Sequence, residues 1–266
     1  MGLHRPDRLI PPAAGTAEVG SAHGPPGIVS PMDSKPQRDR FVERVAGDVL
    51  HWAWGHVERL ATVGHTNREA RRFAAFGEGT AVNFPSTVLH GVSRIEVGED
   101  CIIGPYATLS AGMPVPLDDR ADPIVTIGDR CWLGKGIGIV AHERVVIGDD
   151  TCAGHFVYIT DQNHGYENVD EPIATQLWKN APVSVGKDCW LGHGSVILPG
   201  TTIGDHVVVA AGSVVTGTIP DFTVIAGAPA RIVRRYFPEF GWVPTDRDGN
   251  PREPGDPDTA PPSAPG

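Results

Sequence analysis

An aliphatic side chain recurs at every sixth position through the middle of the chain. The spacing is clearest in residues 183–215, where a Gly or Ala usually follows the aliphatic residue and a small or slim residue stands two positions before it. A six-residue period fits neither the 3.6-residue turn of a helix nor the alternation of a strand. It predicts a flat-sided coil with one short strand per side, whose aliphatic residues point inward and stack on counterparts eighteen residues later.

The same spacing extends back to residue 97 in sets of three. The inward positions are Val97, Ile103 and Leu109; Ile127, Leu133 and Ile139; Ile147, Ala153 and Ile159; Val185, Leu191 and Ile197; and Ile203, Val209 and Val215. They predict about five coils, each of which contacts only its neighbours. Two segments, 110–124 and 160–182, interrupt the period. Because a coil tolerates insertions only at its corners, we expect both to project as loops.

The flanking segments lack this regular period. Residues 1–40 are rich in Pro, Gly and charge, and we expect them to be disordered. Residues 41–94 are expected to cap the coil with irregular strands and a helix over 41–60. That helix would pack on the first coil or on a partner subunit, or would serve as a substrate lid. Residues 95–235 are expected to form the coil, and 236–266 a C-terminal tail. The start of this tail, residues 236–242, is a candidate to pack on the coil or on a neighbour.

Composition and cysteine usage indicate which binding partners and which cellular compartment to expect. The formal net charge is −10, which argues against a general nucleic-acid or membrane-surface partner. No stretch has the length and apolarity of a membrane span or signal peptide, so we expect a cytoplasmic protein. Cys101, Cys131 and Cys189 stand two residues before inward positions and are expected to be buried, whereas Cys152 is out of phase and more exposed.

The repeat, with TrpLeuGly at 190–192 and AlaGlyAlaProAlaArg at 226–231, resembles the hexapeptide-repeat acyltransferases. The chain is similar to their maltose, galactoside, xenobiotic and cell-envelope sugar O-acetyltransferases. This resemblance implies an all-β fold, a left-handed parallel β-helix, and a homotrimer with active sites between subunits. It also implies acetyl-CoA as the co-substrate, no metal, and direct transfer of an acetyl group to a hydroxyl of a sugar or glycosylated acceptor. N-acetylation of an amino sugar is the alternative.

The resemblance assigns the catalytic base to His164, on the loop after a coil. An imidazole with an unperturbed pKa of about 6.5 can take a proton from a hydroxyl near neutral pH and pass it to a leaving thiolate. Its second ring nitrogen needs an acceptor to hold it. Asp161, Glu167, Glu171 and a backbone carbonyl remain open for this role, with the carbonyl and Asp161 preferred.

The resemblance also assigns residues to the two substrates. The acceptor is expected to meet Asp161, Asn163 and His142, and the coenzyme His193, Ala211, Thr216, Arg231 and Arg234. Two departures from the family stand out. Gly217 replaces a Lys that meets the coenzyme's phosphates in many relatives, so either coenzyme binding is weaker or another Arg compensates. Gly134 and His142 replace an Asn and a carboxylate of sugar-modifying relatives, so His142 either bonds a different acceptor or only occupies a coil corner.

Two other classes remain open. The zinc-dependent γ-type carbonic anhydrases share the fold and use three His across a subunit interface, for which His142, His155, His164 and His193 are candidates. However, GlyHisGly at 192–194 lacks the second His that follows it in that family. A non-catalytic β-helix scaffold would require that His164 be dispensable and that no coenzyme bind.

Overall fold

The computed structural model describes residues 37–112, 122–246 and 250–252. Most of the predicted N-terminal disorder, part of the predicted loop 110–124 and most of the predicted tail lie outside these residues. The chain divides into two compact units, and the boundary after Trp52 falls inside the first helix.

Helix α1 spans Gln37–Ala61 and carries an apolar stripe. The stripe includes Val42, Val45, Val49 and Trp52, spaced three and four residues apart, as expected for one side of a helix. All four side chains are exposed. A contact between this helix and a partner subunit stays a prediction.

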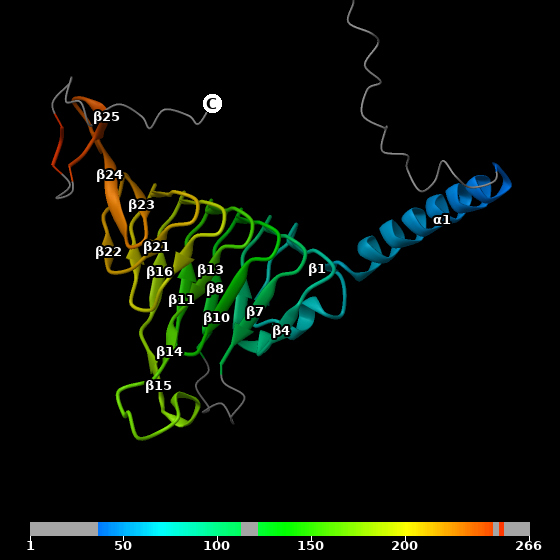
Figure 1. Ribbon diagram of the computed structural model, residues 1–266, viewed down its shortest axis with the longest axis horizontal. Coiled ribbons are helices and arrows are strands. Elements are labelled where there is room, and N and C mark those ends of the chain that lie inside the picture. The colour runs from blue at the N-terminus through cyan, green and yellow to red at the C-terminus, as the bar shows by residue number, and fades with distance from the viewer. Residues whose placement is uncertain (1–36, 113–121, 247–249, 253–266) are drawn as a thin grey trace, which may run out of the picture. The chain divides into compact units, whose positions relative to one another are not determined.

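Three sheets, which we call A, B and C, form the body of the described chain after this helix (Figure 1). Sheet A contains, in order, β1 (Val63–Gly64), β3 (Ala81–Val82), β6 (Ile102–Ile103), β9 (Trp132–Leu133), β12 (Cys152–Ala153), β17 (Trp190–Leu191), β20 (Val208–Val209), β23 (Thr223–Gly227), β24 (Ala230–Phe237) and β25 (Gly241–Pro244). Sheet B contains β2 (Ala75–Phe76), β5 (Ile95–Val97), β8 (Val125–Ile127), β11 (Val145–Ile147), β16 (Val183–Val185), β19 (Thr202–Ile203) and β22 (Thr218–Ile219). Sheet C contains β21 (Val214–Val215), β18 (Val196–Ile197), β13 (Tyr158–Thr160), β10 (Gly138–Ala141), β7 (Thr108–Ala111) and β4 (Val88–His90).

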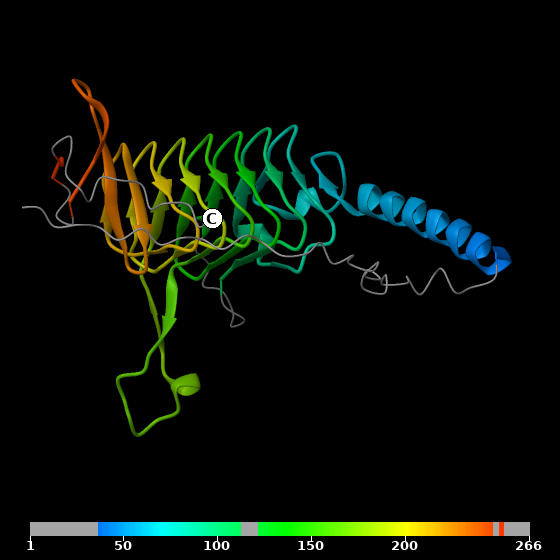
Figure 2. The same cartoon turned by 45° about the horizontal axis from the view of Figure 1, so that its top comes forward.

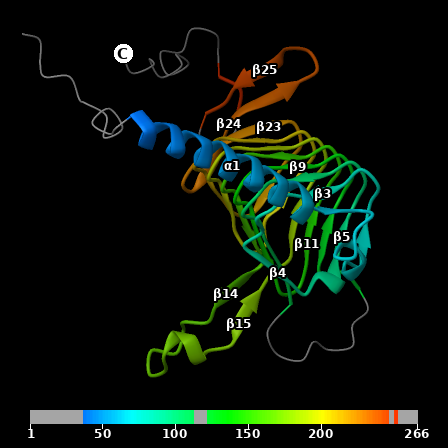
Figure 3. The same ribbon diagram turned by 90° about the vertical axis from the view of Figure 1, so that its right-hand side faces the viewer.

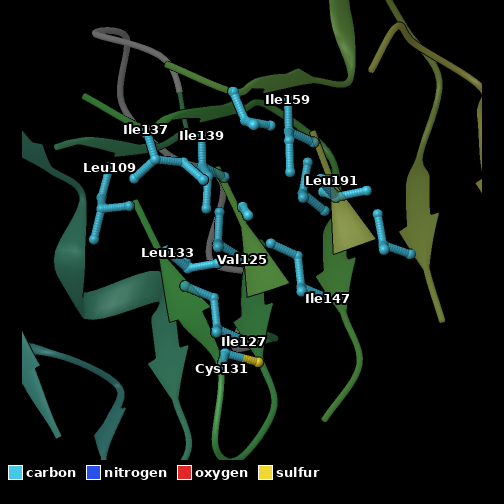
Figure 4. Packing of buried hydrophobic residues seen from close by; sticks show 14 of the residues in the cluster. Leu109, Val125, Ile127, Cys131, Leu133, Ile137, Ile139, Ile147, Ile159 and Leu191 are labelled. Atoms are coloured by element: carbon cyan, nitrogen blue, oxygen red, sulfur yellow. The ribbon is translucent and has the colours of Figure 1, made fainter. Parts of the chain in front are cut away.

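The chain visits sheets B, A and C in turn, so each coil contributes one strand to each sheet. Neighbouring coils pair in parallel and in register: Val185 lies opposite Ile147 on one side and Ile203, eighteen residues later, on the other. All the predicted inward positions are buried. Figure 4 shows Leu109, Ile139 and Ile159 from sheet C facing the interior with residues of the other two sheets. The predicted parallel β-helix is confirmed.

The β-helix begins one coil earlier than the six-residue period indicates. Strands β2, β3 and β4 form a regular coil, in which Phe76, Val82 and Leu89 lie opposite Val97, Ile103 and Leu109. The prediction of irregular capping strands was therefore wrong for residues 75–90. The inward positions of this coil are spaced by six and then by seven residues, so the strict six-residue period does not reveal it. The short 3-10 helices η1 (Ala70–Arg72) and η2 (Val92–Arg94) flank its strands.

Residues 236–246 do not form a tail but pack on the β-helix, which was one alternative for residues 236–242. Strands β24 and β25 extend sheet A in antiparallel fashion beyond the last coil. Aromatic side chains support this extension: the ring of Trp242 lies 6.0 Å from that of His206 and 5.7 Å from that of Tyr236. The added strands cover an edge of sheet A that would otherwise leave backbone groups unpaired.

Both interruptions of the period fall at one corner, formed by the turns that lead from sheet C to sheet B. We call it the C-to-B corner. The second insertion forms an antiparallel hairpin of β14 (Gln162–His164) and β15 (Trp178–Asn180), with η3 (Ile173–Thr175) between them. Figures 1 and 2 show this hairpin projecting from the β-helix, and Figure 3 shows it from the end of the coil.

The cysteine prediction is also confirmed. Cys101, Cys131 and Cys189 are at most 3% exposed, whereas Cys152 is partly exposed on the outside of sheet A. The Sγ of Cys101 donates a hydrogen bond to the carbonyl oxygen of Gly128 at 3.1 Å. These thiols fill the inside of the turns between sheets B and A, so they serve as small core side chains.

The closeness of neighbouring coils gives a testable consequence at Gly192. A Cβ there would lie 2.5 Å from the amide nitrogen of Ala211 and 2.6 Å from the carbonyl oxygen of Val209. Because both are backbone atoms of the next coil, Gly192→Ala should lower the free energy of unfolding by about 1–3 kcal/mol, measured by chemical denaturation. Gly64→Ala is the control, since its Cβ would meet no atom within 4 Å. Equal losses of unfolding free energy in the two variants would contradict the close packing of Gly192 on the next coil.

Candidate active site

The projecting hairpin presents His164. In the register of β14 and β15, Gln162 lies opposite Asn180, and Asn163 opposite Lys179. Because side chains alternate along a strand and paired residues share a face, Gln162, His164 and Asn180 lie on one face and Asn163 on the other. The side chains of both His164 and Asn163 are exposed. The structure therefore does not bring Asn163 to the same face as His164.

Asp161 anchors the base of this hairpin. Its side chain is fully buried, and its Oδ1 accepts a hydrogen bond from the amide of His142 at 2.8 Å. Its Oδ2 accepts from the amides of Glu143 at 2.8 Å and Arg144 at 2.7 Å. The carbonyl oxygen of Asp161 accepts the amide of Ala181, where the chain leaves the hairpin, at 2.7 Å. Asp161 thus joins the two ends of the hairpin to the turn of the preceding coil.

This arrangement gives Asp161 a structural role that the sequence did not indicate, because its buried carboxylate accepts three backbone amides. Its predicted contacts with the acceptor and with His164 stay predictions. Glu167 is also engaged, in an ion pair with Lys179 across the hairpin. The Lys179 ammonium holds the pKa of that carboxyl below its usual value.

His142 lies at the same corner, in the turn that follows β10. Its side chain is partly buried and hydrogen-bonds to the side chain of Asn180. Burial lowers the pKa of His142, and a charge on His164 lowers it further. The charge of Asp161 and the bond to Asn180 act in the opposite direction and raise the pKa. His142, Asn180 and His164 therefore form one polar group at the C-to-B corner. The sequence analysis did not identify Asn180, because only the hairpin pairing brings it to His142.

Two of the predicted coenzyme residues share a different corner, formed by the turns from sheet A to sheet C, which we call the A-to-C corner. The carbonyl oxygens of His155 and His193 accept the amides of Gly194 at 2.9 Å and Gly212 at 2.8 Å, so His155, His193 and Ala211 occupy successive coils. The rings of His155 and His193 lie 6.3 Å apart. The Nδ1 of His155 accepts the amide of Lys135 at 3.0 Å.

The remaining predicted coenzyme residues lie elsewhere on the last coils. Thr216 follows β21 and is exposed at the C-to-B corner. Arg231 and Arg234 lie on β24, opposite Ala226 and Val224, and both are exposed. The structure thus distributes these residues over both ends of sheet C and strand β24 of sheet A, rather than gathering them in one place within the chain.

The four histidines weighed as zinc ligands fall into two pairs. His142 and His164 lie at the C-to-B corner, and His155 and His193 at the A-to-C corner. Throughout residues 37–112, 122–246 and 250–252, no three His, Cys, Asp or Glu side chains gather closely enough to hold a metal ion. Among the described helices, none has the length and apolarity needed to cross a membrane.

A cavity of about 270 Å³ lies on the outside of sheet A. It is lined by Asp150, Cys152, Asp188, Cys189, Trp190, His206 and Val208. None of the residues predicted from the sequence to bind a substrate is among them. The polar group at the C-to-B corner, rather than this cavity, carries the predicted base.

Comparison with known proteins identifies the family. The family pattern described as bacterial transferase hexapeptide (six repeats) matches residues 182–217. The putative lipopolysaccharide biosynthesis O-acetyl transferase WbbJ of Escherichia coli (strain K12) is 37% identical over 134 residues, which cover 48% of this chain and 68% of WbbJ. The chain belongs to the hexapeptide-repeat acetyltransferase family.

Two further comparisons, one with a curated enzyme and one with a solved structure, give the following similarities. The galactoside O-acetyltransferase of E. coli (strain K12) is 32% identical over 149 residues, which cover 53% of this chain and 70% of that enzyme. A crystal structure of a mutant of AntD, an N-acyltransferase from Bacillus cereus, superposes with a TM-score of 0.57 at 17% identity, covering 67% of this chain and 92% of AntD. The fold is the left-handed parallel β-helix, and the protein is an acyltransferase.

Proposed function

We propose that the protein moves an acetyl group from acetyl-CoA to a hydroxyl of a sugar or glycosylated acceptor, with His164 as the general base. The observation that carries this proposal is the exposed imidazole of His164 on a hairpin that Asp161 ties to the β-helix. An anchored but solvent-facing imidazole can meet a bound hydroxyl and still keep a defined position. The names of WbbJ and of the galactoside enzyme support the sugar acceptor.

The chemistry needs no covalent enzyme intermediate. His164 removes the proton of the acceptor hydroxyl while its oxygen attacks the carbonyl carbon of the thioester. A backbone N–H donates to the oxyanion of the tetrahedral intermediate. Collapse of this intermediate breaks the carbon–sulfur bond, and the leaving thiolate takes the proton back from the imidazolium. The products are an acetyl ester and free CoA.

The donor would be held by the last coils. His193 and Ala211, exposed at the A-to-C corner, would lie beside the pantetheine arm, and Thr216 would meet it further on. Arg231 and Arg234 would bind the phosphates, because exposed guanidinium groups form paired hydrogen bonds with phosphate oxygens. With Gly217 at the Lys position of relatives, these two arginines carry the phosphate contact.

The assembly is part of the same proposal. A homotrimer would place each site in a groove between two subunits, and the exposed apolar stripe of α1 is available for a subunit contact. The wide separation of the coenzyme residues within one chain supports a site shared between subunits. A cytoplasmic location, where acetyl-CoA is available, stays a prediction.

Donor binding can be tested without knowing the acceptor. Acetyl-CoA at about one hundred times its dissociation constant should raise the free energy of unfolding by about 2.7 kcal/mol, measured by thermal unfolding. The Arg231→Ala, Arg234→Ala double variant should need a higher concentration for the same shift. CoA release should then appear with a sugar bearing free hydroxyls, and an amino sugar with blocked hydroxyls tests the N-acetyl alternative. Stabilisation by zinc alone, or by neither ligand, would favour a metal site or a scaffold instead.

A further inference from the structure

Two parallel rows of side chains run along the outside of sheet A. The polar row occupies the turns that lead from sheet B into sheet A, and all its members have a positive φ: Arg130, Asp150, Asp188 and His206. The apolar row lies two positions later, on β9, β12, β17 and β20: Trp132, Cys152, Trp190 and Val208. The residue between the two members from each coil is buried, so both rows face away from the core.

Large and small side chains alternate in the apolar row. Cys152 lies opposite Trp132 on one side and opposite Trp190 on the other. The two tryptophans are therefore two strand spacings apart, about 10 Å. Trp132 is 63% exposed and Trp190 is 50% exposed, although burial of so large an aromatic side chain is strongly favourable. Two exposed indoles on one regular sheet form a platform for a ligand with flat apolar faces.

The cavity of about 270 Å³ lies where the two rows meet beside Trp190. Apart from the buried Cys189, its lining comes from the two rows: Trp190, Cys152 and Val208 from the apolar row, and Asp150, Asp188 and His206 from the polar row. The cavity therefore combines an aromatic and apolar surface with a few hydrogen-bonding groups, as sites for small organic ligands do.

The polar row is held in place by contacts within the chain. Arg130 donates two hydrogen bonds to the carboxylate of Asp150, at 2.6 and 2.8 Å. This guanidinium holds the pKa of Asp150 below its usual value, so the carboxylate stays ionised. The Nδ1 of His206 lies 2.5 Å from a carboxylate oxygen of Asp188, and its ring stacks on that of Trp242. Each carboxylate has about four acceptor positions, so a partly exposed one can also accept hydroxyl groups.

The chemistry of the two rows selects the ligand. One face of a sugar ring presents C–H groups, which pack on the negative face of an indole, and its rim carries hydroxyls that bond to carboxylates. The carboxylates of Asp150 and Asp188 repel a phosphate or another anion. A repeating surface with two indoles about 10 Å apart fits a chain of sugars better than a single sugar.

We propose that the two rows form a docking surface for an uncharged oligosaccharide, whose rings stack on Trp190 and Trp132 while its hydroxyls bond to the polar row. The proposal rests on the proposed function and deepens it, because it makes the acceptor a sugar chain. The strand that carries Trp190 leads within three residues to His193, where the pantetheine arm is proposed to lie. A sugar chain docked on sheet A would therefore extend toward the donor.

Calorimetric titration of the full chain tests the docking surface, with glucose, galactose and mannose oligomers from the single sugar to the hexasaccharide. At least one series should bind at least about tenfold more tightly as its length increases. Trp132→Ala and Trp190→Ala should each weaken hexasaccharide binding about five- to tenfold, whereas Trp190→Tyr, which keeps an aromatic face, should lose less than about threefold. Affinity that does not increase with length in any series would overturn the proposal.

Phe240→Ala is the matched control for the loss of an exposed aromatic side chain. Phe240 is 79% exposed and lies between β24 and β25, outside both rows. Its substitution should leave hexasaccharide binding unchanged, and a loss equal to that of the tryptophan variants would overturn the proposal. The tryptophan variants should keep the wild-type mass in light scattering. A change of mass would show that the rows contact a second copy of the chain, and would also overturn it.

Kinetics separate docking from chemistry. With the series that binds, Trp132→Ala should raise KM for the hexasaccharide about five- to tenfold and leave KM for the single sugar and for acetyl-CoA unchanged. Equal increases for the single sugar and the hexasaccharide would overturn the docking surface but not the role of His164. Full activity of His164→Ala would instead overturn the proposed function, while binding that depends on length and on both tryptophans would still support the docking surface.

Discussion

His164→Ala should lower kcat by about 10²- to 10⁴-fold, the usual contribution of a general base. The reason is that an unassisted hydroxyl is a poor nucleophile near neutral pH, and no other group would take its proton as the carbon–oxygen bond forms. The loss should appear in kcat rather than in KM for acetyl-CoA, because His164 follows sheet C at the hairpin whereas the proposed coenzyme residues lie on the last coils. Steady-state release of CoA measures the change.

A control histidine makes this result specific. His65 is exposed and lies just after β1, outside the polar group at the C-to-B corner. His65→Ala should retain wild-type activity, and both variants should retain the thermal shift given by acetyl-CoA. If His164→Ala also kept wild-type kcat, His164 would not be the base.

Asp161→Asn should lower the free energy of unfolding by about 3 kcal/mol or more. The carboxylate accepts three backbone amides through two oxygens. Asparagine has nearly the same size, but its NH₂ group would face at least one of these N–H donors. A buried N–H donor left without an acceptor costs about 1–3 kcal/mol of stability. The substitution affects more than one of the three backbone hydrogen bonds, so the total loss is larger. Chemical denaturation measures the loss.

Asp205→Asn is the matched control for this change. Asp205 is exposed and its Oδ1 accepts one amide, that of Lys187, at 2.8 Å. Its substitution should cost less than about 1 kcal/mol, because water can replace a single exposed bond. Similar losses for the two variants would show that the buried carboxylate does not anchor the hairpin. A loss specific to Asp161 should also disturb the His142 turn and lower activity.

The inward ladder could be predicted because its information is local. Each side of the coil is about six residues long, so burial imposes a period on neighbouring positions such as Val185, Leu191 and Ile197, all of which are buried. The same argument predicted the buried cysteines. The coil over 75–90 was missed because Phe76, Val82 and Leu89 break the strict spacing, although they stack as regularly as the rest.

The interrupted period predicted that His164 is exposed on a projecting insertion. The repeat itself indicated the family. The roles of Asp161 and Asn180 did not follow. A carboxylate and an amide within a polar loop have the same appearance in sequence whether they meet a substrate, another side chain or the backbone. Their partners in residues 142–144 come from the preceding coil, more than fifteen positions away.

The sequence by itself determined the repeat, the family and the residue types available for acetyl transfer, because hydrophobic burial repeats along the chain and can be recognised in any one coil. Only the tertiary structure decided which polar side chains share a corner. Stacking of the coils brings His142 beside the hairpin, burial directs Asp161 toward backbone amides, and strand pairing turns Asn180 to the face of His164. These contacts depend on hydrogen-bond geometry between coils, which leaves no period in the sequence.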